Sequence, residues 1–375
     1  AGLSLPTAID WAPDGRMFIT LKDGQVKVFE NGQLLPTDFI DISAQVNDYW
    51  DRGLLGIAVH PNFPATPYVY LLFTYDPPDL PGAPGANDGP DGAGERVSRL
   101  IRVSAFLTNT NVADPASEVV VLGKNSTLAN IGSPAAKDAV GGKPSCDDSG
   151  TPIEDCLPSD GPSHSIGTVV FGKDGSLYVG SGESTPFVDP DPRSLRAQNL
   201  DSLGGKIMRI DPATGNGYPD NPFYDGDPTH NRSRVWSYGL RNPFRFAIQP
   251  VTNEPFIGDV GWYAWEEINT GKGKNFGWPC YEGDDKGSAR QTSYEYYAGT
   301  LAVCTTLYDQ GPNAVQAPLY AYDHSLGDAA IIPGVFYTGT AYPSEYQGAL
   351  FFADYSRGWI TYLTFDANGQ ATVHD

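Results

Sequence analysis

The chain lacks long apolar runs and has few basic residues. No stretch of about 18 or more consecutive apolar residues occurs, so we expect no membrane-spanning helix. Lys and Arg number 24 against 45 Asp and Glu, which gives a formal net charge of −21. A field of that sign repels nucleic acid and anionic membranes, so neither is expected as a partner. The acidity is typical of a protein kept soluble in an extracellular setting.

A signal peptide is not evident either, because no charged start followed by an apolar stretch is present. The sequence begins at Ala1 rather than Met, as expected for a processed chain or an excised domain. The four cysteines show no zinc-ligand spacing and allow three pairings in principle. The pairs Cys146/Cys156 and Cys280/Cys304 would close the shortest loops. Two disulfides imply an oxidising compartment, so we expect a secreted protein.

Sustained helical periodicity is also missing, since no long stretch places apolar residues at a spacing of about 3.6 positions. The composition includes 43 Gly and 32 Pro, which interrupt helices, and 21 Tyr and 17 Phe, which favour strands. We therefore predict an all-β protein of short strands and many turns. All-β chains of this length can close as one unit, so residues 1–375 are expected to form a single domain.

A degenerate hairpin recurs along the chain, with two apolar arms around a turn. One such hairpin cannot bury both of its faces, whereas several placed radially around an axis can. At about 45–50 residues per blade, the length predicts a β-propeller of six to eight blades. A β-sandwich is the alternative, but it does not explain the repeated Asp-Gly hairpins. The copies lie at 9–20, 55–73, 167–180, 246–258 and 334–363.

Three insertions rich in turn-forming residues separate the copies, at 77–95, 109–162 and 281–315. Long loops in compact domains are usually functional or disordered. On a propeller such loops collect on one face and wall a pocket around the axis.

Only five histidines occur, and His164 is the candidate general base. It lies in Gly161-Pro-Ser-His-Ser-Ile-Gly167, directly before a strand pair, and its ordinary pKa suits proton transfer near neutral pH. Glu183 ends the same hairpin, which returns to its starting edge, so its carboxylate is expected beside the imidazole. The alternative for His164 is a hydrogen-bonded loop histidine without a catalytic role.

A second candidate pair is Arg241 and Asn242, at a turn before another strand. A guanidinium beside an amide suits a carbonyl or carboxylate ligand, although a structural Arg–Asp pair is the alternative. Downstream, 257–269 and 275–279 place glycines between aromatics, and carbonyls exposed in such a turn could bind calcium. No EF-hand loop is present, so composition alone does not require calcium.

Taken in order, these segments resemble the soluble quinoprotein sugar dehydrogenases, which include soluble glucose dehydrogenase and aldose sugar dehydrogenases. The insertions and paired cysteines are most similar to the fungal secreted branch, the pyranose dehydrogenases. The matching segments are Asp51–Phe63, Ser163-His164, Leu203–Asp211, Gly239–Pro243, Gly261–Asn269, Asn275–Pro279 and Phe351–Tyr355.

The resemblance implies a six-bladed propeller that binds pyrroloquinoline quinone (PQQ), calcium and a sugar on one face. It implies that His164 takes the proton of the sugar hydroxyl while hydride passes to the quinone, and that Glu183 supports the histidine. Arg241 and Asn242 would bind the quinone oxygens, and Arg241 would also polarise the carbonyl that gains charge.

The resemblance further implies that the backbone carbonyls of Gly261 and Trp262 help to hold calcium. Arg357 matches a basic residue near the quinone carboxylates, and Arg52 neighbours a first-blade contact position. The electron acceptor implied is a cytochrome or a haem domain.

The chain departs from the best-known bacterial member at several of these positions. Ser163 and Glu183 stand where that member has Asp, a lysine expected near 337–338 is absent, and Asp51 or Arg52 replaces Gln. Quinone binding is still expected, but the sugar is left open. Two other classes are a non-catalytic extracellular binding propeller and a calcium-dependent propeller lactonase. The lactonase would need clustered Asp, Asn and Glu around one metal, and no such motif is present.

Overall fold

The structure is a computed structural model that describes residues 2–77, 94–133, 143–187, 191–283, 302–366 and 369–374. Their main regular structure is a set of antiparallel sheets, and the five large ones are named here the first to the fifth sheet in chain order. Among the described residues, no helix combines the length and apolar composition needed to cross a membrane.

The first and second sheets have five strands each. The first contains β1 (Pro6–Trp11), β2 (Met17–Leu21), β3 (Gln25–Glu30), β4 (Gln33–Leu34) and β5 (Ile40–Asp41). The second contains β6 (Leu54–Val59), β7 (Tyr68–Tyr75), β8 (Arg96–Phe106), β9 (Asn109–Leu122) and β12 (Leu157–Ser159). A separate two-stranded ribbon consists of β10 (Asp147–Asp148) and β11 (Thr151–Pro152).

The other three sheets have four strands each, paired in chain order. The third contains β13 (Ile166–Phe171), β14 (Leu177–Ser181), β15 (Lys206–Ile210) and β16 (Val235–Tyr238). The fourth contains β17 (Arg245–Ile248), β18 (Pro255–Asp259), β19 (Trp265–Thr270) and β20 (Tyr320–Asp323). The fifth contains β21 (Ile331–Phe336), β22 (Leu350–Asp354), β23 (Trp359–Phe365) and β24 (Ala371–His374).

Helical segments are short. In the described ranges the α-helices are α1 (Asn231–Arg234) and α3 (Ala302–Asp309). The 3₁₀ segments are η1 (Ser43–Gln45), η3 (Leu128–Asn130), η4 (Pro192–Gln198), η6 (Pro312–Ala314) and η7 (Ser344–Tyr346).

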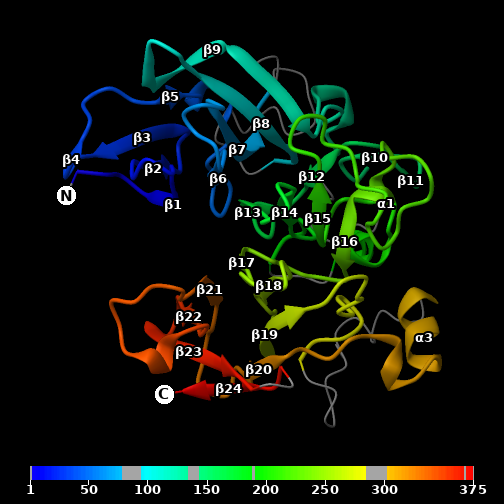
Figure 1. Ribbon diagram of the computed structural model, residues 1–375. Helices are drawn as coiled ribbons and strands as arrows, with labels where there is room; N and C mark the ends of the chain where they lie inside the picture. The colour runs from blue at the N-terminus through cyan, green and yellow to red at the C-terminus, as the bar shows by residue number, and fades with distance from the viewer. Residues whose placement is uncertain are drawn as a thin grey trace.

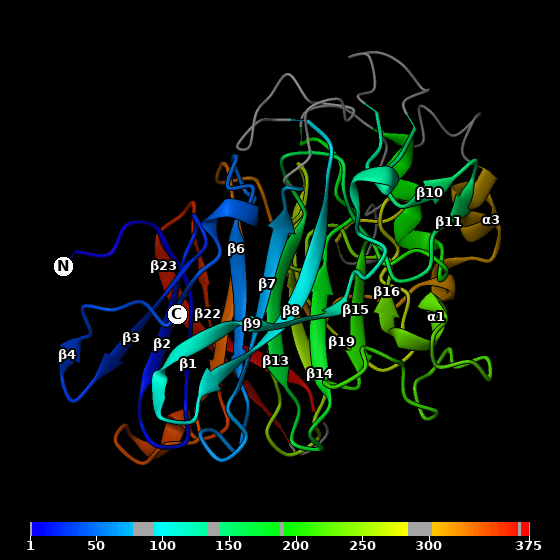
Figure 2. The ribbon, with the colours of Figure 1, turned by 90° about the horizontal axis from the view of Figure 1, so that it is seen from above.

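The five sheets are arranged around a central axis in chain order, and the ring is open between the first and fifth sheets (Figure 1). Seen at 90°, strands of successive sheets run side by side in nearly the same direction (Figure 2). Each sheet packs on the next near its first strand: β1 on β6, β6 on β13, β13 on β17, and β17 on β21. The all-β class is confirmed. Five large sheets are described, so the count of six blades stays a prediction, as does the single domain.

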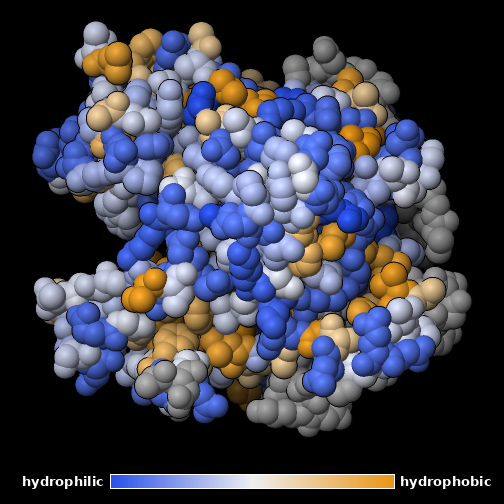
Figure 3. Space-filling model, turned by 45° about the vertical axis from the view of Figure 1, so that its right-hand side comes forward, coloured by the Kyte–Doolittle hydropathy of each residue, from blue (hydrophilic) through white to orange (hydrophobic). Residues whose placement is uncertain are grey.

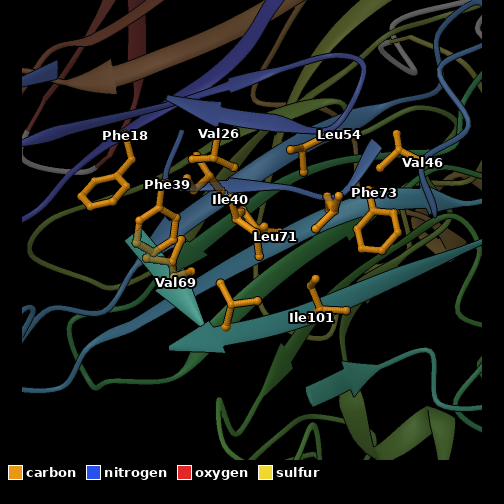
Figure 4. Packing of buried hydrophobic residues seen from close by; sticks show 14 of the residues in the cluster. Phe18, Val26, Phe39, Ile40, Val46, Leu54, Val69, Leu71, Phe73 and Ile101 are labelled. Atoms are coloured by element: carbon orange, nitrogen blue, oxygen red, sulfur yellow. The ribbon is translucent and has the colours of Figure 1, made fainter. Parts of the chain in front are cut away.

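The core between the first and second sheets shows why the strands form where they do. β3 alternates, with Val26 and Val28 pointing inward, whereas β7 is buried along nearly its whole length and mostly apolar because both of its faces are covered. Phe18 and Phe39 meet edge to face at 5.0 Å (Figure 4). Full burial of each such side chain stabilises the fold by roughly 1.5–3 kcal/mol.

The insertion at 109–162 differs from the long loop expected from its sequence. Residues 109–122 form β9, which pairs with β8 through three register shifts, so this strand is irregular and contains Asp114-Pro115. The expected loop at 77–95 lies mostly outside the described residues. The insertion at 281–315 contains α3. Of the three possible cysteine pairings, the structure forms Cys146–Cys156 and Cys280–Cys304.

A partly buried arginine connects three of the sheets. Arg245, at the start of β17 in the fourth sheet, donates from Nη1 to Leu55 O at 3.0 Å and from Nη2 to Thr7 O at 2.7 Å. Leu55 belongs to the second sheet and Thr7 to the first. Burial lowers the pKa of Arg245 to about 10, so the guanidinium remains charged at neutral pH.

Candidate active site

The candidate residues gather at one end of the sheets because of the strand order. Within each sheet the first two strands are antiparallel, so the start of the first strand and the end of the second lie at the same edge. His164 precedes β13 and Glu183 follows β14, while Arg241 precedes β17 and Gly261 follows β18. Arg52 precedes β6 in the same way.

His164 and Glu183 are in hydrogen-bond contact. The pairing of Ile166 with Ser181 brings the two ends of the β13–β14 hairpin together, and His164 Nδ1 lies 2.7 Å from Glu183 Oε1. Both side chains are buried. The structure therefore places the two residues as the hairpin argument expected, while their catalytic roles stay predictions.

The backbone of His164 is held in an uncommon conformation. Its φ of 50° is in the left-handed region, which a non-glycine residue adopts only when its surroundings enforce it. Ser184 N–H donates to His164 O at 2.8 Å, and a Cβ at Gly182 would lie only 2.2 Å from that oxygen. Glycine at 182 thus permits the close approach that fixes the histidine backbone.

Burial lowers the pKa of the His164 imidazole, and the positive charge of Arg241 lowers it further, while Glu183 opposes both effects. Glu183 Oε2 also accepts from Thr185 N–H at 3.1 Å, which fixes the carboxylate. A carboxylate facing Nδ1 favours the tautomer with its proton on that atom. The imidazole is therefore neutral at pH 7, with Nε2 as the proton acceptor.

Arg241 and Asn242 form a turn that a single buried carboxylate holds. Their backbone N–H groups donate to the two oxygens of Asp259 at 2.9 and 2.6 Å. Arg241 Nη1 donates to Val260 O at 2.9 Å and to Gly261 O at 2.6 Å. Within the described part of the chain, Arg241 Nε and Nη2 and the Asn242 side-chain amide have no protein partner. These groups are available to an anionic or carbonyl-bearing ligand.

Buried acids surround the turn that follows β18. Gly261 N–H donates to Glu266 Oε1 at 3.2 Å, and Trp262 N–H donates to Glu282 Oε1 at 2.7 Å. Burial raises the pKa of Asp259 to about 7, against the hydrogen bonds from Arg241 and Asn242. Sequence reasoning missed these acids as a group, although Asp259 and Glu266 lie in the same short segment as Gly261; only Glu282 comes from a separate segment.

Two arginines predicted to bind cofactor are engaged with backbone carbonyls. Arg52 is fully buried and donates from Nη2 to Ser159 O at 2.9 Å and to Gly161 O at 3.0 Å, in the loop before His164. Burial, with a contribution from the charge of Arg96, lowers its pKa to about 9. Arg357 donates from Nη2 to Asp323 O at 2.8 Å and to Gly327 O at 3.1 Å. Their roles toward a cofactor stay predictions.

An aromatic wall lies beside the histidine, and sequence reasoning missed it. The ring of Phe187 lies 6.3 Å from His164 and 6.0 Å from Tyr263. The Arg241 guanidinium carbon lies 5.6 Å from the Phe187 ring centre and 5.4 Å from that of Trp278. Phe187 and Tyr263 are 43% and 56% exposed, so this wall faces solvent and can contact a flat ligand.

Two cavities bordered by described residues lie away from these side chains. One of about 640 Å³ is lined by residues of the 144–152 and 192–202 segments, including Arg193 and Arg196. These arginines already pair with Asp191 and Asp160. The second, of about 520 Å³, lies on the fifth sheet. The chemistry of His164 and Arg241, rather than cavity volume, therefore identifies the candidate site.

The fold and the site together define an all-β protein with radial sheets, whose candidate site combines a buried histidine–carboxylate pair with a buried arginine. The chain matches the Glucose / Sorbosone dehydrogenase family over residues 3–110 and 151–375, and it belongs to that family.

The chain is similar in sequence to three curated proteins of known name. It is 29% identical to HIPL1 protein of Arabidopsis thaliana over 73% of the chain. It is 26% identical to aldose sugar dehydrogenase YliI of Escherichia coli over 74% of the chain. It is 24% identical to quinoprotein glucose dehydrogenase B of Acinetobacter calcoaceticus over 84% of the chain. The matches cover 41%, 59% and 58% of those proteins, so the chain spans about half the length of these relatives.

Solved structures share the fold. A putative glucose dehydrogenase of Thermus thermophilus is 26% identical, with a TM-score of 0.62, and covers 100% of this chain and 84% of its own. The PQQ-bound aldose sugar dehydrogenase of Streptomyces coelicolor is 21% identical, with a TM-score of 0.61, and covers 100% of this chain and 82% of its own. The PQQ domain of pyranose dehydrogenase from Coprinopsis cinerea is 11% identical over 100% of this chain and 79% of its own, with a TM-score of 0.51. Placement in the fungal branch stays a prediction.

Proposed function

We propose that this protein is a PQQ-dependent dehydrogenase that oxidises a hydroxyl of an aldose or ketoaldose sugar. The observation that carries the proposal is the buried His164–Glu183 pair within the electrostatic reach of Arg241, in a chain of this family. A neutral imidazole with Nε2 as acceptor suits removal of a hydroxyl proton. Such a base contributes roughly 10²–10⁴-fold to a rate. Glu183 stabilises the imidazolium that forms.

The residues present fit the quinone. PQQ carries three carboxylates and quinone carbonyls, which require hydrogen-bond donors and positive charge. The unpartnered donors of Arg241 and the Asn242 amide supply both at one turn, and the wall of Phe187 offers a flat apolar surface. When bound, PQQ supplies the two-electron acceptor for the hydride that leaves the sugar carbon. Arg357 and Arg52 are proposed to act at the quinone carboxylates less directly, since their Nη2 atoms already donate to carbonyls.

Calcium is the second proposed cofactor, held in part by the carbonyls of Gly261 and Trp262. Gly261 O accepts from Arg241, but a carbonyl oxygen has a second lone pair that can face a cation. Asp259, Glu266 and Glu282 surround this turn, against one guanidinium. That surplus of carboxylate would offset the charge of a divalent ion. Calcium suits such an irregular set of oxygens.

The location of the protein and its electron acceptor are also proposals. The two disulfides support secretion, and the electron acceptor is proposed to be a cytochrome or haem domain. The second candidate is a non-catalytic extracellular binding propeller. A lactonase has less support, because no three acidic, histidine or cysteine side chains converge on a metal position among the described residues.

The deciding experiment adds PQQ and calcium to the purified protein, supplies a panel of aldoses and ketoaldoses, and follows reduction of an artificial electron acceptor. Sugar-dependent reduction is expected in the parent. His164→Ala should bind PQQ but lose turnover by about 10²-fold or more. His230→Ala, at an exposed histidine paired with Asp225, is the control. PQQ binding without any sugar oxidation across the panel would favour the binding propeller.

A further inference from the structure

Two asparagines of the chain stand in the Asn-x-Ser/Thr pattern that accepts an N-linked glycan. The first pattern is Asn-Ser-Thr at 125–127, and the second is Asn-Arg-Ser at 231–233. The proposed catalysis uses neither of them. Both asparagines are hydrogen-bonded to the same short segment, 153–156, which follows β11 and ends at the disulfide-bonded Cys156. The structure therefore allows the two candidate acceptors to be compared directly.

Asn231 is fully buried at the start of α1. Its Nδ2 donates to Ile153 O at 3.0 Å and to Asp201 O at 2.8 Å, so both amide hydrogens are used. Its Oδ1 accepts from Asp155 N–H at 2.8 Å. An N-linked sugar would replace one of the two hydrogens and would have to lie in the interior of the protein. A chain with a glycan at Asn231 therefore cannot reach this fold.

Asn125 is exposed in the loop between β9 and η3. Its Nδ2 donates to Glu154 O at 2.8 Å, and this amide has no second acceptor in the described part of the chain. One hydrogen can therefore be replaced by a sugar while the other keeps the bond to Glu154. The neighbouring β10–β11 ribbon lies on the side that comes forward in Figure 3, where hydrophilic residues predominate. A glycan at Asn125 would thus project into solvent.

The loop around Asn125 keeps its shape without the hydroxyl group of Thr127. Backbone hydrogen bonds hold it, from Asn125 N–H to Asp155 O and from Thr127 N–H to Asn125 O, both at 2.9 Å. Thr127 precedes η3, but its side chain makes no capping hydrogen bond there. The hydroxyl group that the acceptor pattern requires thus has no structural role in this loop.

We propose that Asn125 carries an N-linked glycan in the secreted protein and that Asn231 does not. The proposal rests on the proposed secretion and on no catalytic step. The transfer forms a bond between Asn125 Nδ2 and the anomeric carbon of an oligosaccharide. It breaks the bond from that carbon to the diphosphate of a lipid-linked donor, and one amide proton is released with the lipid diphosphate, without oxidation or reduction. The glycan would stand beside the loop that the Cys146–Cys156 disulfide closes.

Secretion of the chain from eukaryotic cells, followed by treatment with a peptide N-glycosidase, tests the proposal by intact-mass spectrometry. The parent should lose the mass of one glycan. The enzyme converts the linked asparagine to aspartate, and a peptide map should find this conversion at 125 and not at 231. Thr127→Ala should lose no mass. Ser233→Ala, which removes the second pattern, is the matched control and should lose the same mass as the parent.

An unchanged mass of the secreted parent after treatment would overturn the proposal. A mass loss that persists in Thr127→Ala would also overturn it, since Asn231 would then carry the glycan. Asn125→Gln is the second variant and keeps the test decisive if Thr127→Ala does not fold. Sugar-dependent reduction of an artificial acceptor, measured on the same preparations with PQQ and calcium, reports on the proposed function independently of the glycan.

Discussion

Arg241 Nη1 lies 2.6 Å from Gly261 O, the oxygen that calcium is proposed to share. The guanidinium therefore connects the proposed quinone contacts with the proposed metal position. Its charge also helps to keep His164 neutral. One side chain thus influences the base, the quinone and the ion, which makes it the most informative position in the site.

Arg241→Ala should weaken PQQ binding by roughly 10–100-fold, because charge-assisted hydrogen bonds contribute about 1.5–3 kcal/mol. A binding titration of PQQ against the parent measures this. Arg232→Ala, at a half-exposed pair with Asp201, is the control and should leave the affinity unchanged. Equal PQQ affinity in the parent and Arg241→Ala would show that the guanidinium does not contact the quinone.

Chelation of calcium should abolish sugar oxidation, and calcium should restore it where magnesium does so poorly. Magnesium needs a tight octahedron and retains its water, whereas calcium accepts irregular oxygen ligands. Unfolding curves with and without PQQ provide the control. A cofactor ion should stabilise the protein mainly when PQQ is present, whereas a structural ion would stabilise it in both cases. If calcium restored nothing to a chelated enzyme supplied with PQQ, the proposed ion site would have to be abandoned.

Glu183→Gln should lower kcat by roughly 10²-fold or more while PQQ still binds. If the glutamine amide N–H₂ faces Nδ1, it reverses the tautomer and places the imidazole proton on Nε2. Steady-state kinetics at saturating PQQ measures kcat. Glu345→Gln, at an exposed carboxylate, is the control. A parent-like kcat would mean that Glu183 has only a structural role.

The pH dependence follows from the lowered pKa of His164. The neutral imidazole is the active base, so activity should be lost as pH falls through the folded pKa, below the ordinary 6.5. The unfolded chain takes up a proton near pH 6.5 and the folded chain does not, so acidification below that value favours unfolding. The free energy of unfolding should fall more between pH 7.5 and 5.5 for the parent than for His164→Asn. An equal fall in both proteins would contradict the assignment.

Arg52→Lys should lower the stability of the protein more than its affinity for PQQ. Lysine keeps the charge but has one nitrogen, so it cannot bind Ser159 O and Gly161 O as Nη2 does while also reaching Asn47 Oδ1 as Nη1 does. Loss of one such bond costs about 1.5–3 kcal/mol. Thermal unfolding and PQQ titration distinguish the two roles. A drop in affinity at unchanged stability would instead support direct contact between Arg52 and the quinone.

The sequence was sufficient to predict which side chains meet where both belong to one hairpin. His164 and Glu183 are 19 positions apart, and the return of one hairpin brings them together. Arg52 is different, because its acceptors are more than 100 positions away and its burial depends on how distant loops pack. Glu282 reaches Trp262 N–H from 20 positions away, whereas Glu266 is only five positions from Gly261 and lies within the segment singled out from the sequence.

The prediction of a loop at 109–122 was wrong for a physical reason. The whole segment 109–162 was interpreted as a loop from its content of turn-forming residues, but β9 accommodates such residues by register shifts along its pairing with β8. A strand with one solvated face tolerates such residues, and the composition alone does not distinguish it from a loop.

The hydrogen bonds of Arg245 also bear on how the ring comes apart. This side chain belongs to the fourth sheet and donates hydrogen bonds to backbone carbonyls in the first strands of the first and second sheets. Detaching the first or the second sheet removes one of these acceptors, and detaching the fourth removes both, so each separation weakens the pairing of a partly buried cation. Linear arrays, whose units contact only their neighbours, can fray from one end. An arginine bonded to two other sheets instead couples the unfolding of all three sheets, even though the ring itself is open.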